Sequence, residues 1–419
     1  MQSSVNKSSF FGFEEGWGNR SYFAYYGQFQ RESTAIVGIE VFFLILLWIW
    51  GVVGNVLVII VVISNKGMRK SNTNLFIVNL SVSDILFTMG NPLIATTRVT
   101  ESWIFGRVLC GLMPLLEFVC GYVSIWTMTF ISIDRFRVIV GHRSRKFKLG
   151  TVIGMVAFTW ISGILFFIPL AIYFQIREFP FKDGTATLCT LVWPYVSKTF
   201  NVSYPYTAVG ISLFFIVPLV IIVHNYSRIL HFLWKKRQKL NKSLRTSSEI
   251  GSFSTISRNG TNNVNGETLR RRTLSDCEAS RDQRDLNVVR FLVIIVVAFI
   301  VSWTPIFITL SLVVYDGNME VPTLSSQIFI LTASITFSNA CINPIIYGTF
   351  NQNFRRGFKK IGQSLKLCKS MRDIDTSIRC SSTENHHPSK DGNHDSGIVL
   401  SNVNAEGQLH ADMHQEEKF

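Results

Sequence analysis

The sequence predicts an all-α membrane protein, a seven-transmembrane helix bundle with a short amphipathic cytoplasmic helix after it. The chain has 419 residues, of which 47% are hydrophobic and only 16% are charged. Globular proteins carry about a quarter charged residues, so this chain has few side chains with which to face water. Spanning a bilayer as a helix takes about 20 predominantly apolar residues. Seven largely uncharged stretches meet that length: 36–64, 73–98, 108–140, 149–173, 204–234, 286–315 and 324–349.

These stretches favour helices over the strands of a membrane β-barrel. Only helices and closed barrels satisfy every backbone hydrogen-bonding group in lipid. Runs such as VFFLILLWIWGVVGNVLVIIVVI in the first stretch lack the strict alternation of a barrel strand. The first 35 residues are polar and aromatic, without the apolar core of a cleavable signal, so we expect the first span to act as the signal anchor.

The distribution of basic residues predicts the orientation in the membrane. Short cytoplasmic loops carry an excess of Lys and Arg, and here the loops after spans one, three and seven are basic, whereas the opposite loops mix both signs. We therefore expect a multi-pass plasma-membrane protein with an extracellular N-terminus and a cytoplasmic C-terminus. The net charge of +14 is mostly this topology signal, and nucleic-acid binding is not expected. The basic loop residues are Lys66, Arg69, Lys70, Arg143, Arg145, Lys146, Lys148, Arg355, Arg356, Lys359 and Lys360.

The chain divides into one bundle and its polar appendages. We expect an extracellular tail over 1–35, the bundle over 36–349, an amphipathic helix over 350–365 and a cytoplasmic tail over 366–419. The third cytoplasmic loop, 236–284, and the cytoplasmic tail are rich in polar residues and are predicted to be disordered, because such segments cannot bury enough apolar surface.

Three Asn-X-Ser/Thr motifs fall on the predicted extracellular side. Asn6, Asn19 and Asn201 are therefore candidate glycosylation sites. The motif also occurs on the predicted inner side, at Asn241 and Asn259, so chance occurrence is the competing interpretation.

Polar residues inside the spans are the strongest functional signal, because ionisable groups are costly in a bilayer. Asp84 lies in the second span and Glu117 in the third. Asp134 and Arg135 follow about 25 residues after Cys110, roughly 37 Å along a helix that rises 1.5 Å per residue, so they lie at the opposite membrane face. The other notable residues within spans are Asn55, Trp160, Pro218, Tyr226, the WTP motif at 303–305 and NACINPIIY at 339–347.

Taken together and in this order, these motifs resemble those of rhodopsin-like (class A) G-protein-coupled receptors. The resemblance covers about residues 36–362, including the segment NQNFRRGFKKI, which matches the family's short cytoplasmic helix 8. It implies a receptor rather than an enzyme, with no required cofactor. Its expected partners are an extracellular ligand, a heterotrimeric G protein, membrane lipids, and arrestin and receptor kinases on the cytoplasmic tail. Three departures leave basal activity and G-protein choice open: Phe136, His142 and Ser302 replace the commoner Tyr, Pro and Cys.

The resemblance assigns Arg135 the role of a switch. Asp134 and Asp285 are expected to hold it, and such a pair near water contributes about 1 kcal/mol, weak enough for a ligand to shift the balance. A kink at Pro305 would let the sixth helix pivot outward and free Arg135 for a G protein. The other implied switch residues are Tyr226, Asn343, Pro344 and Tyr347, and the implied activation packing residues are Ile125, Pro218, Phe299 and Trp303.

The resemblance also implies an allosteric sodium site around Asp84. Ser124, Asn339 and Asn343 match the family's other ligands, and oxygen ligands suit a hard cation. A purely structural hydrogen-bond network is the competing interpretation.

Two cysteines lie near the predicted outer face, Cys110 at the start of span three and Cys189 in the loop before span five. They are either free thiols or a disulfide, which the outer compartment permits, and the resemblance favours the disulfide. Cys368 follows the amphipathic segment and is a candidate for palmitoylation.

Glu117 is the distinguishing charge of the expected ligand site, because it lies about two helical turns below Cys110. It could bind a basic group of a peptide, or be satisfied by neighbouring residues. In amine receptors of this family Asp stands at this position, so the alternative is a biogenic-amine receptor with Glu117 as the ammonium counter-ion. Trp303 is expected beneath the ligand.

The second outer loop favours a peptide ligand. YFQIREFPFKDGTATLCTLVWP alternates apolar and polar residues around KDGT, which predicts a β-hairpin. Such a hairpin is typical of peptide-activated members, and Glu178 and Asp316 would add acidic groups to the rim. The chain resembles neuropeptide receptors of the RF-amide, orexin, galanin and tachykinin group.

Other classes fit less well. A transporter or channel is a remote alternative, because transporters tend to show internal repeats and the sequence shows none. The spans hold no catalytic motif such as HExxH or GxSxG. A retinal-linked opsin needs a Lys in the seventh span, and 324–349 contains none. A non-signalling scaffold is disfavoured because the switch residues are all there.

Overall fold

The computed structural model describes residues 9–12, 21–27, 34–141, 147–181, 184–194, 201–253, 293–316 and 323–364. The contacts reported below lie within Met1–Ile361, which forms one compact unit; the second unit, Gly362–Phe419, contributes only residues 362–364 to the described part.

The described residues contain 7 helices long and apolar enough to cross a membrane. Each overlaps one predicted span, which confirms the predicted fold class. The spans are Thr34–Ser64, Asn72–Thr100, Gly106–Ile139, Leu149–Tyr173, Ser203–Lys239, Val293–Asp316 and Ser326–Thr349. The helices are α1 (Thr34–Ser64), α2 (Lys66–Arg69), α3 (Asn72–Thr88), α4 (Asn91–Thr100), α5 (Gly106–Ile139), α6 (Leu149–Tyr173), α7 (Ser203–Ile211), a π-helical turn (Ser212–Ile216), α8 (Val217–Phe253), the helix Val293–Asp316, α10 (Ser326–Phe350) and a last helix over 352–364.

Two spans are interrupted at prolines. The second span breaks between α3 and α4, where Pro92 occupies the first turn of α4. Proline has no N–H, and its ring clashes with the carbonyl four residues earlier, which favours a break at this point. The fifth span has its π-helical turn, Ser212–Ile216, just before Pro218. Such turns recur at functional sites in helices.

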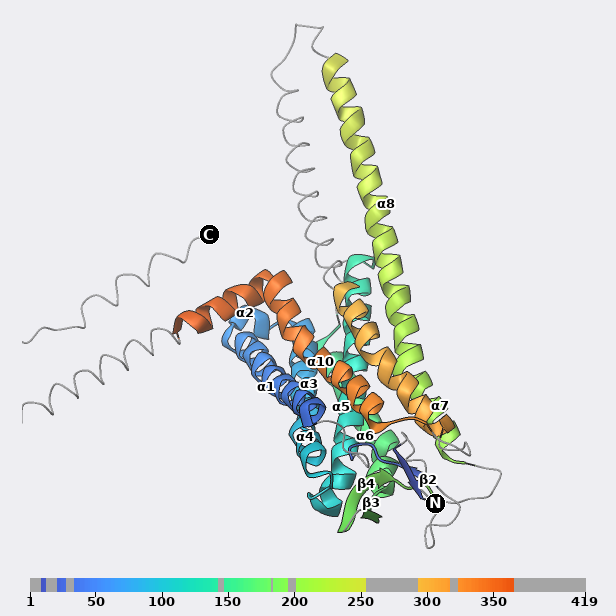
Figure 1. Cartoon of the computed structure of the whole chain (residues 1–419). Coiled ribbons are helices and arrows are strands. Elements are labelled where there is room, and N and C mark those ends of the chain that lie inside the picture. The colour runs from blue at the N-terminus through green and yellow to red at the C-terminus, as the bar shows by residue number, and fades with distance from the viewer. Residues whose placement is uncertain are drawn as a thin grey trace, which may run out of the picture. The chain divides into compact units, whose positions relative to one another are not determined.

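The third span, α5, lies at the centre of the bundle, in contact with α3, α6 and α8, while α1 packs against α3, α4 and α10 (Figure 1). Buried polar groups connect these helices. Trp160 Nε1 donates to Asn79 Oδ1 (2.9 Å), and Asn79 Nδ2 donates to Thr127 Oγ1 (2.8 Å). Asn55 Nδ2 donates to the carbonyl of Ala340 (2.9 Å). Spans one to four and seven are thereby held by hydrogen bonds as well as by apolar contact.

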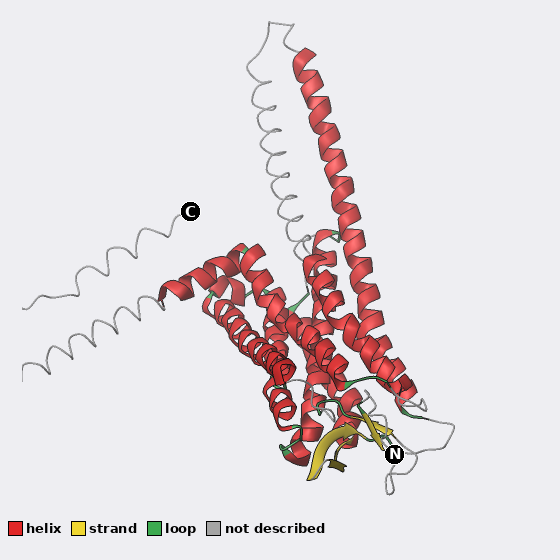
Figure 2. Ribbon diagram, in the orientation of Figure 1, coloured by secondary structure: helices red, strands yellow, loops and turns green. Residues whose placement is uncertain are grey.

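The described strands form two antiparallel hairpins, which lie at one end of the bundle (Figure 2). β3 (Phe174–Phe181) pairs with β4 (Gly184–Leu191), from Phe174 opposite Leu191 to Phe181 opposite Gly184. This confirms the hairpin predicted for the second outer loop. β1 (Phe10–Gly12) pairs with β2 (Ser21–Phe23), a hairpin that the sequence did not predict. We call this end of the bundle the hairpin end and the opposite one the Arg135 end.

Beyond the fifth span, the structure departs from the sequence prediction. α8 continues to Phe253, so residues 236–253 are helical although they fall within the range predicted to be disordered. The sequence KKRQKLNKSLR is rich in strong helix formers. Extending an existing helix avoids the unfavourable nucleation step, which accounts for the continuation.

Candidate functional site

The hairpin end is fastened to the bundle by a disulfide. Cys110 at the start of α5 and Cys189 in β4 are bonded, with Cα atoms 5.6 Å apart. The backbone N–H of Trp103 also donates to the carbonyl of Thr187 in β4 (2.6 Å). The predicted disulfide is confirmed, and it holds the β3–β4 hairpin against the end of α5.

Glu117 lies inside the bundle at the break in the second span. Its carboxylate packs against Gly90, the second of the two residues between α3 and α4, so closely that a Cβ at Gly90 would collide with Oε1. Within the described part of the chain, Glu117 Oε1 is buried without a hydrogen-bond partner. The break at Pro92 thus makes room for a carboxylate of which one oxygen has no hydrogen-bond partner among the described residues.

Trp303 faces the same interior from the sixth span. It stacks on Phe87, with ring centroids 5.5 Å apart. A Cβ at Gly121 would lie 2.6 Å from its ring, so Trp303 rests on the backbone of α5 one helical turn beyond Glu117. Its Nε1 is a second buried atom with no partner among the described residues. Glu117 Oε1 and Trp303 Nε1 are thus two of several buried side-chain atoms that have no hydrogen-bond partner among the described residues.

The two predicted rim acids differ in their surroundings. Glu178 is exposed on β3. Asp316 is engaged, because its Oδ2 accepts hydrogen bonds from the backbone N–H groups of Thr323 (2.8 Å) and Leu324 (2.7 Å) before α10 begins. A ligand role for either residue stays a prediction.

Asp84 lies at the centre of a buried polar cluster. Its side chain accepts hydrogen bonds from Ser124 Oγ (3.1 Å) and Asn343 Nδ2 (2.8 Å), which joins α3 to α5 and α10. Ser83 and Ser124 share a further hydrogen bond of 2.8 Å. Asn339 is also buried in α10, but the structure records no bond between it and Asp84. Three of the four predicted sodium ligands are thus brought together by direct hydrogen bonds.

At the other end of α5, Arg135 and Asp134 form a loose ion pair. Arg135 Nη2 lies 3.4 Å from Asp134 Oδ2, and the Arg135 side chain is 26% exposed. Asp134 Oδ2 also accepts a hydrogen bond from Thr73 Oγ1 (2.9 Å). Tyr226 of α8 is buried close enough to Arg135 for the two to interact electrostatically. Asp285, the other predicted partner, lies outside the described residues.

Several of the remaining predicted residues lie in the described part of the chain, and their roles stay predictions. Ile125, Pro218 and Phe299 are buried, and Phe299 contacts Trp303, with ring centroids 5.9 Å apart. Tyr347 stacks on Phe354 of the last helix, at 5.2 Å. Pro344 packs against Gly54 of α1, and Asn201 accepts from the N–H of Ser203 (3.0 Å) at the start of α7. Asn6, Asn19 and Cys368 lie outside the described residues.

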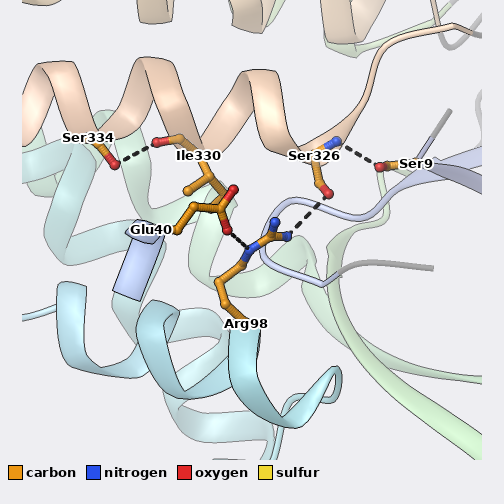
Figure 3. A network of polar contacts seen from close by, with 6 residues as sticks. All are labelled: Ser9, Glu40, Arg98, Ser326, Ile330 and Ser334. Carbon is orange, nitrogen blue, oxygen red and sulfur yellow. Dashed lines mark hydrogen bonds and ion pairs between the residues drawn. The ribbon is translucent and has the colours of Figure 1, made fainter. Parts of the chain in front are cut away.

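The sequence analysis missed a buried ion pair at the hairpin end. Arg98 Nε lies 2.8 Å from Glu40 Oε2, and Arg98 Nη1 donates to Ser326 Oγ (3.4 Å). Figure 3 shows Arg98 between Glu40 and Ser326, with Ser9 beyond Ser326. Both charged residues lie within predicted spans, so the cost of charge in a bilayer should have marked them.

These observations define a class of protein: a helical membrane protein of seven spans, with a buried carboxylate cluster at its centre and unsatisfied polar groups facing its interior. Residues 54–347 match the family described as "7 transmembrane receptor (rhodopsin family)". That match covers most of the chain, which therefore belongs to this family of class A G-protein-coupled receptors. It is a multi-pass membrane receptor and not an enzyme.

The chain is similar to several receptors. It is 28% identical to free fatty acid receptor 4 of Rattus norvegicus over 348 residues, 82% of this chain and 87% of that receptor. It is 28% identical to neuropeptide FF receptor 1 of Rattus norvegicus over 352 residues, 80% and 72% of the two chains. It is 30% identical to somatostatin receptor type 5 of Bos taurus over 314 residues, 74% and 72%.

Among solved structures, squid rhodopsin shares the fold. Its TM-score is 0.61 at 22% identity, and the match covers 81% of this chain and 89% of that chain. At this identity the likeness bears on the fold alone.

Proposed function

We propose that this receptor binds an extracellular peptide through a basic group and activates heterotrimeric G proteins. The observation that carries the proposal is the buried Oε1 of Glu117, which has no hydrogen-bond partner among the residues that the structure describes. Leaving a buried polar group unsatisfied is costly, and more so for a charge. A cationic ligand group would relieve that cost, so binding energy is available at this position.

A peptide is favoured over a biogenic amine because of the hairpin above the site. β3–β4 is fastened by the disulfide and offers backbone groups and the exposed Glu178 to a long ligand. Relatives named as neuropeptide FF and somatostatin receptors support a peptide. An amine paired with Glu117 is the alternative.

A fatty acid is the second candidate, because relatives named free fatty acid receptor 4 are as similar as the peptide receptors. The charges argue against it. Glu117 offers a carboxylate no positive partner, and Arg98 is already paired with Glu40, although its buried Nη2 has no hydrogen-bond partner among the described residues.

In this proposal the hairpin end is extracellular and the Arg135 end cytoplasmic. The Lys and Arg bias of the loops supports it, and so does the disulfide, since disulfides persist in oxidising compartments. The receptor would then lie in the plasma membrane, with arrestin and receptor kinases as partners of its cytoplasmic tail.

Activation follows from the weakness of the Arg135–Asp134 pair. A ligand that draws Trp303 and the outer half of the sixth helix inward would move its inner half outward about Pro305. Arg135 would then leave Asp134 and line a cavity for the G protein. A sodium ion among Asp84, Ser124 and Asn343 would hold the inactive arrangement, as an allosteric ion rather than a required cofactor.

The test is a functional screen in cells that carry promiscuous G-protein reporters. Amidated neuropeptides, biogenic amines and long-chain fatty acids are applied to the receptor and to Glu117→Gln, with the exposed Glu178→Gln as the matched control. We expect a peptide hit that Glu117→Gln loses and Glu178→Gln keeps. An amine or fatty-acid hit would replace the peptide assignment, and a peptide hit indifferent to Glu117→Gln would remove Glu117 from the site.

A further inference from the structure

Part of the N-terminal segment is folded onto the hairpin end. The N–H of Ser9 donates to the carbonyl of Leu324 (3.0 Å), and the N–H of Ser326 donates to Ser9 Oγ (2.7 Å). Ser325, at the N-cap position of α10, makes no side-chain capping bond. Ser9 therefore satisfies one of the free N–H groups at the start of α10, although it lies at the other end of the chain.

The same segment is joined to the β3–β4 hairpin. Thr190 Oγ1 donates to the carbonyl of Phe23 (2.8 Å), one residue from the disulfide-bonded Cys189. Tyr22 and Ala24 form a small apolar cluster with Leu188 and Val192 of the hairpin. The N-terminal segment is thus attached to both the seventh span and the second outer loop.

Its aromatic side chains fill the space between these elements. Phe23, Tyr25 and Tyr26 are 3%, 8% and 3% exposed. The ring of Tyr25 lies 5.2 Å from Phe329 of α10 and 5.5 Å from Phe174 of β3.

Tyr26 extends this contact toward the candidate ligand site. Its ring lies 6.0 Å from Trp103, just before α5. Burial raises the pKa of the Tyr26 phenol well above its usual value, and the negative charge of Glu117 raises it further. The ring of Tyr26 also lies 6.3 Å from Phe329 of α10, so Tyr26 packs between Trp103 and α10 at the end of the bundle that leads to Glu117.

We propose that residues 22–27 are a tethered occupant of the receptor's own ligand site, which a ligand must displace before it binds. The inference rests on the proposed function, in that Glu117 marks the ligand site. The segment YFAYYG carries no charge, so it supplies aromatic packing but leaves Glu117 without a cation. A tether of this kind holds its occupant at an effective concentration in the millimolar range.

The proposal narrows the chemistry of the ligand. A competitor must replace the contacts that the tyrosines make with Phe329, Phe174 and Trp103. The competing ligand binds more favourably than the tethered segment only if it adds an interaction that the segment lacks, namely a cation that pairs with Glu117. We therefore expect a peptide whose bound end combines aromatic side chains with a basic group.

The test measures access to the interior and needs neither ligand nor G protein. Ala333 is buried in α10, one helical turn below Phe329 on the same face. Ala333→Cys places a small thiol there. Its reaction with a charged methanethiosulfonate is followed by mass spectrometry in the purified full-length receptor, with and without Tyr25→Ala/Tyr26→Ala. Phe42→Ala/Phe43→Ala, an exposed aromatic pair on α1, is the matched control.

We expect the thiol to react about tenfold faster, or more, when both tyrosines are removed. The reagent can then reach the thiol without a prior opening of residues 22–27, which otherwise limits the rate. Thr190→Val removes only the hydrogen bond to Phe23 and should give a smaller increase in the reaction rate. It provides a second test of the proposal if the double variant does not fold. The control pair should leave the rate unchanged. Equal rates in all four chains would overturn the proposal without touching the proposed function, which the screen tests by itself.

Discussion

Two arginine–carboxylate pairs lie at opposite ends of this bundle, and their surroundings differ in every respect. At the hairpin end, Arg98 Nε lies 2.8 Å from Glu40 Oε2, and the two side chains are 0% and 16% exposed. At the other end, Arg135 Nη2 lies 3.4 Å from Asp134 Oδ2, with exposures of 26% and 5%. Arg98 is further bonded to Ser326, whereas Asp134 divides its oxygen between Arg135 and Thr73.

The difference indicates that the ion pair at the Arg135 end costs less free energy to break than the pair at the hairpin end. Removing one partner of a buried pair leaves an uncompensated charge and costs about 3–5 kcal/mol. A pair near water contributes about 1 kcal/mol or less. The hairpin end also carries the disulfide and the bonds of Ser9. Rearrangement of the helices is therefore cheaper at the Arg135 end than at the hairpin end, where the displacement proposed above concerns the N-terminal segment and not the helices.

The largest expected effect comes from breaking the buried pair. Arg98→Met alone should leave the Glu40 carboxylate without its positively charged partner. We expect it to lower the free energy of unfolding by about 3–5 kcal/mol. Glu40→Gln/Arg98→Met removes both charges and should recover much of that loss. Thermal unfolding of the purified receptors measures both. A double variant as unstable as the single one would show that the pair is not what stabilises this end.

Loss of the disulfide should come next. Cys110→Ser should destabilise the receptor by about 2–4 kcal/mol and reduce its surface expression. Because both cysteines serve one bond, Cys110→Ser/Cys189→Ser should be no worse than either single variant. Additive losses in the same unfolding assay would mean that the two residues act separately.

A smaller effect is expected where Glu117 meets the break in the second span. Gly90→Ala places a methyl group against the Glu117 carboxylate, and such overpacking costs about 1–3 kcal/mol. Gly154→Ala is the control, because a Cβ there meets nothing within 4 Å. We expect Gly90→Ala to weaken agonist binding and Gly154→Ala to leave it unchanged. Equal affinities would place the ligand away from Glu117.

The smallest effect concerns the Asp84 cluster. If a sodium ion binds there, a sodium concentration tenfold above its dissociation constant should stabilise the receptor by about 1.4 kcal/mol. We expect sodium chloride to raise the melting temperature above that in N-methylglucamine chloride, and Asp84→Asn to abolish the difference. A sodium effect that survives Asp84→Asn would leave Asp84 in a structural network only.

Much of the fold could be predicted because it depends on composition along single segments. Each span is a long apolar run, and the β3–β4 hairpin follows from alternation around a turn sequence. The Asp84 cluster could be predicted because its residues stand in recognisable motifs of α3, α5 and α10.

The N-terminal hairpin could not be predicted in this way. It depends on contacts of Ser9 with Leu324 and Ser326, more than three hundred residues away, and its own strands are 3 residues each. The ion pair between Arg98 and Glu40 likewise forms only when α1 and α4 pack side by side, so the sequence of either helix alone does not predict it. The continuation of α8 was missed because polar composition was taken to mean disorder, although the residues are strong helix formers.

The central claim, that the loose pair at the Arg135 end is the switch, is tested most directly by nucleotide exchange. Arg135→Ala and the neighbouring Arg137→Ala are reconstituted with a G protein, and GTPγS binding is measured with the agonist that the screen identifies. We predict that Arg135→Ala reaches the surface and binds the agonist but loses agonist-driven exchange, while Arg137→Ala retains it. Undiminished exchange by Arg135→Ala would contradict the account.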